Sequence, residues 1–245
     1  MNTRLLRLVI FYAIALAGSF AFRFNPPDWF TQLTLPYGLT MVKHLGEGIG
    51  PIIGMLVMVY FFRCKFNTSF LGSNSMRSIL YVSIPLAGII LVGIENEEEL
   101  NRHYYGGIAA LVSLAYVVFE EAGWRGYLLP EMKHFKLNPW LRSAFIGLLW
   151  YVWHLNFTQG AFADHIIFLG VLIFASWGLE KIMDETKSIF MVAGFHFLGS
   201  LLGYNQIMQD GFSSTHRIGL FVICLVSGIY LVSTWNKKQF NPSEN

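Results

Sequence analysis

The stretch from Tyr104 to Pro130, YYGGIAALVSLAYVVFEEAGWRGYLLP, joins a long apolar run to two adjacent carboxylates. Its apolar part is typical of a membrane-spanning helix, which should continue past Glu120 and Glu121 until Pro130 stops it. At about 1.5 Å per residue, the two acids would lie about two turns inside the helix end. A carboxylate at the centre of a membrane helix costs roughly 3 kcal/mol. We therefore expect this pair to have structural partners or a function.

The composition indicates a protein whose main solvent is lipid. Of 245 residues, 54% are apolar and only 13% are charged, and the mean hydropathy is +0.49. Soluble domains carry roughly 25% charged residues. Disordered, fibrous and nucleic-acid-binding classes are excluded, and a soluble enzyme is disfavoured. A net charge of +2 predicts no polyanionic partner, and two cysteines predict no disulfide framework.

Eight stretches approach the roughly 20 apolar residues that one membrane crossing needs. They are Leu5 to Phe22, Leu45 to Phe62, Ile79 to Ile94, Tyr104 to Leu129, Trp140 to Phe157, Ile166 to Leu179, Ile189 to Tyr204 and Ile218 to Trp235. We predict an all-α polytopic membrane protein, with about eight transmembrane helices in one bundle. The bundle would form a single domain over residues 1–245, with the chemical core over residues 104–204. The glycines inside the spans would allow helices to approach closely.

The basic residues predict the orientation, because cytoplasmic loops collect Lys and Arg. Alternate connections gather thirteen of them on one side and four on the other. Both termini would then be cytoplasmic, in the cell membrane, with the active site facing the cytoplasm. The start, MNTRLLR followed by an apolar run, also has features of a cleavable signal peptide. The charge alternation favours a retained anchor.

Glu121 and Arg125 are four residues apart, so they share a helix face and can pair. Glu120 is turned by about 100° and would stay available for chemistry. A purely structural role for the acids, as a buried ion pair that locks helix packing, is the alternative. By contrast, His44 and Glu47 do not form HExxH and are expected at the membrane interface.

Two histidines lie alone in other apolar segments. His154 ends the sequence WYVWH, and His196 precedes Ser200 by four residues on one helix face. A lone histidine in a membrane can equally be a packing residue. Together with Glu120, however, these side chains could activate a water molecule and stabilise an oxyanion.

The three motifs resemble those of the CPBP family of intramembrane glutamic endopeptidases. This family includes the type II CAAX prenyl endopeptidases and bacterial proteins linked to bacteriocin processing and immunity. EExxxR matches Glu120 to Arg125, and FxxxH is met by Trp150 to His154 with Trp in place of Phe. The last family motif, HxxxN or HxxxD, corresponds to His196 through Ser200, where serine departs from the pattern.

The resemblance implies an intramembrane endopeptidase that needs no cofactor. Glu120 and His154 would activate the attacking water, and His196 with Ser200 would bind the oxyanion. Glu121 and Arg125 would support them. Serine donates a hydrogen bond as asparagine does, but with a shorter reach. The expected substrates are peptides or proteins, with prenylated and bacteriocin-like peptides as candidates.

Three alternatives stay open at this point. Glu120, His154 and His196 could instead form the three-ligand open site of a zinc protease. A non-enzymatic immunity or scaffold protein of the same family could keep the residues as a binding network, and Ser200 favours that alternative. A proton-coupled transporter also uses intramembrane Glu and His, but no internal repeat is detectable.

Overall fold

The computed structural model describes residues 3–24, 38–66, 68–96, 99–155 and 160–235, and these are largely helical. The elements in chain order are α1 (Thr3–Phe24), α3 (Gly38–Glu47), α4 (Ile49–Tyr60), α5 (Ser75–Val92), α6 (Arg102–Glu121), the π-helix η1 (Ala122–Leu128), α7 (Leu129–Lys133), α8 (Pro139–Trp153), α9 (Phe162–Thr186), α10 (Ile189–Gly199), the π-helix η2 (Ser200–Tyr204), α11 (Gln206–Gly211) and α12 (Ser214–Ser233). Helix starts are set by polar side chains. Asn74, Asn138 and Ser188, for example, each accept a backbone N–H of the first turn.

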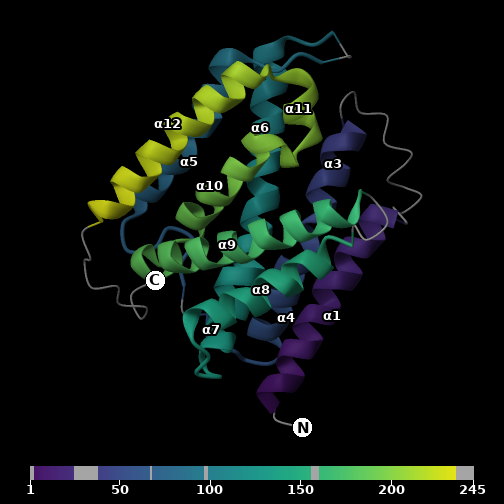
Figure 1. Cartoon of the computed structure of the whole chain (residues 1–245), viewed down its shortest axis with the longest axis vertical. Coiled ribbons are helices and arrows are strands. Elements are labelled where there is room, and N and C mark those ends of the chain that lie inside the picture. The colour runs from purple at the N-terminus through teal and green to yellow at the C-terminus, as the bar shows by residue number, and fades with distance from the viewer. Residues whose placement is uncertain (1–2, 25–37, 67, 97–98, 156–159, 236–245) are drawn as a thin grey trace.

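Helix α6 runs through the middle of the bundle (Figure 1). It contacts α5 and α10 on one side and α3 and α4 on the other. Helices α8 and α9 pack together as a pair and cross the bundle beside α10 (Figure 1). The segments that carry the three motifs, α6 with η1, α8 and α10, are thereby brought around one region.

Glycine permits the closest helix contacts. A Cβ at Gly50 in α4 would lie 2.2 Å from the backbone oxygen of Ala15 in α1, and one at Gly147 in α8 would lie 2.7 Å from Cα of Ile173 in α9. Small residues let membrane helices pack through dispersion where lipid supplies no hydrophobic drive. The predicted role of glycines in helix approach is confirmed at these two pairs.

Every one of the eight apolar stretches contains helix in the described residues. Five helices are long and apolar enough to cross a membrane, and α3 with α4, bent by 42°, makes six if the pair is one span. Helices α8 and α10 have 15 and 11 residues and fall short of that length. The chain is thus a multi-pass membrane protein, and the number eight stays a prediction.

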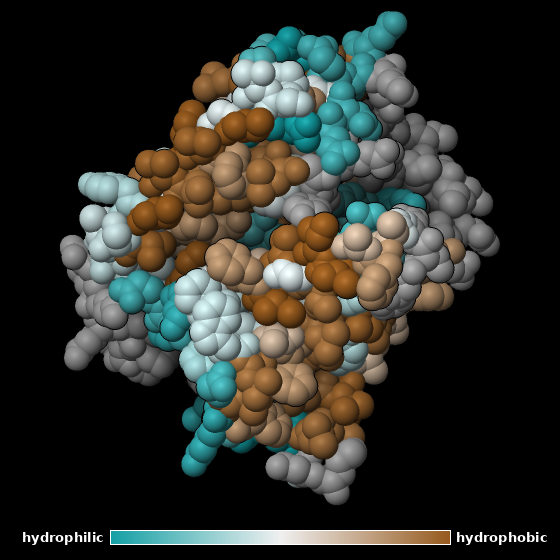
Figure 2. All heavy atoms as spheres, viewed as in Figure 1, coloured by the Kyte–Doolittle hydropathy of each residue, from teal (hydrophilic) through white to brown (hydrophobic). Residues whose placement is uncertain are grey.

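The surface agrees with lipid contact. Figure 2 shows brown, hydrophobic residues over much of the face around α9 and α12. Phe162 and Phe174 in α9 are 80% and 66% exposed, and Leu91 in α5 is 77% exposed. Large apolar patches of this kind mark lipid or protein contact.

The prediction that Pro130 ends the helix is wrong. Helices α6, η1 and α7 form one apolar run over 102–133. The backbone N–H of Leu129 reaches back to the carbonyl of Trp124, which is π-type bonding, before α7 begins. Pro130 falls in the first turn of α7, where a missing N–H is tolerated.

Candidate active site

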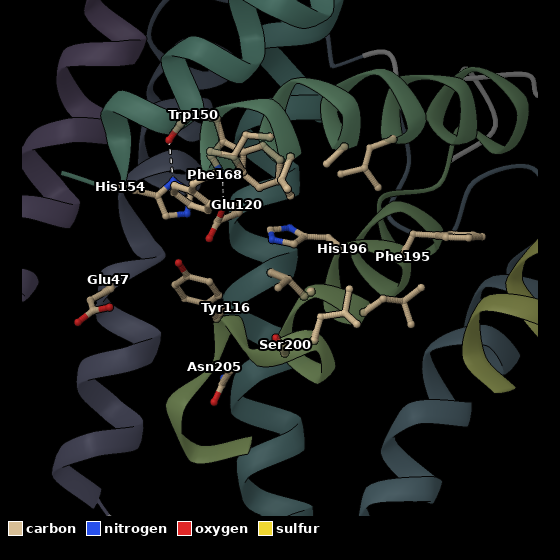
Figure 3. Close-up of a pocket in the computed structure, with 18 of the residues that line it drawn as sticks. Glu47, Tyr116, Glu120, Trp150, His154, Phe168, Phe195, His196, Ser200 and Asn205 are labelled. Atoms are coloured by element: carbon tan, nitrogen blue, oxygen red, sulfur yellow. Dashed lines mark hydrogen bonds between the residues drawn. The ribbon is translucent and has the colours of Figure 1, made fainter. Parts of the chain in front are cut away.

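A cavity of about 800 Å³ lies between α6, α8, α9, α10 and the ends of α1 and α3. The side chains of Glu120, His154, His196 and Ser200, which the sequence singled out, all line it. Figure 3 shows Glu120, His154 and His196 directed toward one another from three helices. The rest of the lining is mainly apolar and comes largely from α9 and α10.

Glu120 is fully buried and only half satisfied. The indole Nε1–H of Trp150 donates to its Oε2 at 2.7 Å. Its Oε1 has no hydrogen-bond partner among the described residues. A buried carboxylate oxygen without a partner calls for a water molecule or a ligand. The acid is therefore held by one oxygen and available at the other.

Glu121 is the centre of a buried charge cluster. Arg125 Nη1 donates to Glu121 Oε1 at 3.0 Å, which confirms the predicted pairing. His196 Nδ1 lies 2.7 Å from the same oxygen. The guanidinium also stacks on Trp150, 4.4 Å from the ring centroid, and contacts Ser176 in α9 at 3.4 Å. The contacts from Arg125 and His196 both go to Glu121 Oε1, whereas its Oε2 is buried without a hydrogen-bond partner among the described residues.

The site contains two π-helical segments. Segment η1 carries Arg125, and η2 begins at Ser200. Single π-turns inside α-helices are frequent at functional sites. A Cβ at Gly123 in η1 would lie 2.5 Å from Pro51 of α4, so this turn packs directly on the neighbouring helix. The sequence pattern indicated only α-helix at both places.

The contacts of the two histidines define their proton positions. His154 caps the end of α8, and its Nδ1 lies 2.7 Å from the carbonyl oxygen of Trp150. Because a carbonyl only accepts, Nδ1 carries the proton, and Nε2 of neutral His154 is an acceptor. Because the oxygen of an ionised carboxylate only accepts, His196 donates Nδ1–H to Glu121, and its Nε2 is the ring nitrogen left for other contacts.

Ser200 is partly exposed and lines the cavity. In Figure 3 it lies on the side of His196 toward Asn205, away from Glu120. Helix α10 ends at Gly199, and the π-helix η2 begins at Ser200. Ser200 therefore lies about one turn beyond His196 along the chain.

His44 and Glu47, which were expected at the membrane interface, both line the cavity. The His44 ring stacks on Tyr116 with centroids 4.3 Å apart. Glu47 Oε2 lies 4.0 Å from Arg23, whose guanidinium covers Trp153. Of these residues, only Tyr116 carried a usable signal, since it precedes Glu120 by four residues and shares its helix face.

Sequence reasoning also missed a second buried ion pair. Arg142 of α8 donates to Glu180 of α9, and both side chains are largely buried. The pair joins the two helices that carry His154 and the apolar wall of the cavity. Its partners are 38 residues apart, and no local pattern connects them.

No three His, Cys, Asp or Glu side chains are arranged to hold one metal ion in the described part of the chain. Glu120, His154 and His196 surround the cavity without forming such a ligand group.

The fold and this cavity define a multi-pass membrane protein with a buried glutamate and two histidines around one site. Residues 104–202 match the family described as Type II CAAX prenyl endopeptidase Rce1-like. This segment is an Rce1-like domain of the CPBP family, and the family is one of peptidases. The resemblance read from the three motifs is confirmed. No curated protein matches the chain in a sequence search.

Proposed function

We propose that this protein is an intramembrane endopeptidase in which Glu120 and His154 activate water. The observation that supports this most strongly is the unpartnered Oε1 of buried Glu120, which faces the cavity shared with His154 and His196. A water there would meet two acceptors, Glu120 Oε1 and His154 Nε2. Both are poised to take a proton.

The reaction balances with these groups. The water oxygen bonds to the scissile carbonyl carbon, Glu120 takes its proton, and the carbonyl π pair moves onto the oxygen. The Nε2–H of His196 and the hydroxyl of Ser200 would donate to this oxyanion. When the C–N bond breaks, the proton on Glu120 passes to the leaving nitrogen. Glu121 holds Nδ1–H of His196, and Arg125 holds Glu121 in place.

The proposed substrate is a peptide or protein with an apolar group near the cleaved bond, and prenylated or bacteriocin-like peptides are candidates. The cavity wall from α9 supports this, since it presents Phe168, Leu172 and Leu179. Burying such a group is favourable by roughly 25 cal/mol per Å² of apolar surface.

The side of entry is proposed to be cytoplasmic, following the distribution of basic residues. Arg23 and Lys43 also line the cavity, although the charge count places both on the other side. Measuring which end of the bundle is accessible from the cytoplasm therefore tests the direction from which the substrate enters.

The purified protein should cleave fluorogenic peptides that carry an apolar or prenylated residue. Glu120→Gln should abolish cleavage, because the amide cannot take the proton. The matched control is Glu95→Gln, an acid whose side chain is 72% exposed. Undiminished turnover by Glu120→Gln would contradict the assignment of Glu120 as the residue that activates water.

We propose that the reaction needs no metal. Dialysis against a strong chelator should leave cleavage unchanged. If the chelator abolishes cleavage and zinc restores it, the zinc mechanism replaces the one given above.

A further inference from the structure

Tyr116 is a polar residue of the cavity for which the reaction above has no use. It lies on α6 one turn before Glu120, and both side chains line the cavity. Figure 3 shows the Tyr116 hydroxyl directed into the space between Glu120 and His154. Tyr116 is therefore within the region where the peptide bond would be attacked.

The Tyr116 ring is held from two sides. On one side it stacks on His44, with centroids 4.3 Å apart and planes at 18°. On the other side it meets the start of α4, where a Cβ at Gly48 would lie 2.6 Å from Tyr116 Cδ2. A side chain clamped in this way can direct its hydroxyl at little entropic cost.

His44 is itself held by a buried amide. Asn205 Oδ1 accepts the N–H of Met208 at 3.2 Å, which fixes the amide so that Nδ2 faces the cavity. Nδ2 then donates to Ser113 at 3.1 Å and to His44 Nε2 at 3.3 Å. Three helical segments thus cooperate to place one phenol beside the glutamate.

We propose that Tyr116 is a further catalytic residue that donates its O–H to the oxyanion, and that His44 and Asn205 are its positioning residues. The inference rests on the proposed peptidase mechanism. A phenol keeps its proton at neutral pH, so it is a donor throughout the reaction. It makes a hydrogen bond as the carbonyl π pair moves onto the oxygen, and no proton leaves it.

The Tyr116 hydroxyl matters more because position 200 holds a serine. Where the family pattern has Asn or Asp, Ser200 offers a shorter reach from the α10 side of the cavity. Tyr116 reaches the same space from α6, next to the attacking water. His196 with Tyr116 would give the oxyanion two donors that do not depend on Ser200.

The test compares Tyr116→Phe with the wild-type protein in peptide cleavage and in binding of a phosphonate analogue of the tetrahedral intermediate. Tyr116→Phe keeps the stacked ring and removes only the donor. We expect kcat to fall about 100- to 1000-fold, as for loss of one oxyanion donor. KM should stay within about twofold, and the Ki of the phosphonate should rise by the same factor as kcat/KM falls.

Tyr12→Phe is the matched control, because its hydroxyl donates to the Leu149 carbonyl at 2.8 Å, outside the cavity lining. It should retain wild-type kcat. His44→Ala should lower kcat about 10-fold with KM unchanged, and His44→Phe should recover most of it by keeping the stack.

Wild-type kcat in Tyr116→Phe would overturn the inference. A lowered kcat with unchanged phosphonate affinity would also overturn it, because the hydroxyl would then act through Glu120. Both outcomes leave the peptidase assignment intact, which depends separately on cleavage by the wild-type protein and its loss in Glu120→Gln.

Discussion

A double-mutant cycle on Glu121 and Arg125 separates the structural role of this ion pair from its chemical role. Both side chains are at most 1% exposed, with Nη1 and Oε1 3.0 Å apart. Removing one partner of such a buried pair leaves a bare charge and costs about 3 to 5 kcal/mol. Arg125→Met should therefore lower the midpoint of thermal unfolding by about 6 to 20 °C for a chain of this size.

Glu121→Gln should destabilise the fold less than Arg125→Met. The Arg125 guanidinium keeps its stacking on Trp150 and its contact with Ser176, so some compensation remains. The double variant should recover at least about 2 kcal/mol relative to the sum of the single changes, because no charge is then left alone.

Catalysis should not recover with stability. In the double variant, His196 loses the carboxylate that holds its Nδ1–H. We expect kcat to stay at least about 100-fold below wild type. The assays are unfolding in a mild detergent and peptide cleavage by the same preparations. Additive losses of stability would refute the ion-pair account, and a stable, active double variant would refute the role of Glu121.

Three further predictions follow from the structure. Ser200→Asn should raise kcat by up to about 10-fold in the cleavage assay, because the longer amide reaches further into the cavity, and a fall in kcat would contradict this. Gly50→Ala should cost about 1 to 3 kcal/mol of stability, because the new Cβ would lie 2.2 Å from the α1 backbone. The control Gly170→Ala should cost no stability, because its Cβ would meet nothing within 4 Å. A membrane-impermeant thiol reagent should label Lys43→Cys in intact cells and Lys136→Cys only after lysis. Both positions are exposed, and both native cysteines are buried. The reverse labelling pattern would show that the predicted orientation is inverted.

The sequence predicted the features that depend on local spacing. The apolar runs are helices because a backbone in lipid must satisfy its own hydrogen bonds. Glu121 and Arg125 pair because four residues make about one turn. The sequence also placed His154 and His196 in two apolar segments other than the one with Glu120, whereas their convergence on one cavity is a property of the packing.

The features that the sequence did not predict depend on contacts between residues far apart in the chain, which no local pattern encodes. His44 reaches Tyr116 only because α3 packs on α6, and Arg142 reaches Glu180 only because α8 packs on α9. The passage of the helix through Pro130 required the π-turn before it. Helix length was equally a matter of packing, since α9 extends from Phe162 to Thr186 while its apolar stretch is shorter.

The central claim is that Glu120 takes the proton from the attacking water. The most direct measurement follows binding and cleavage of one peptide by the wild-type protein and Glu120→Gln. We expect Glu120→Gln to bind the peptide with wild-type affinity and to cleave none of it, and Glu95→Gln to bind and cleave it as the wild-type protein does. Cleavage by Glu120→Gln at the wild-type rate would contradict the account.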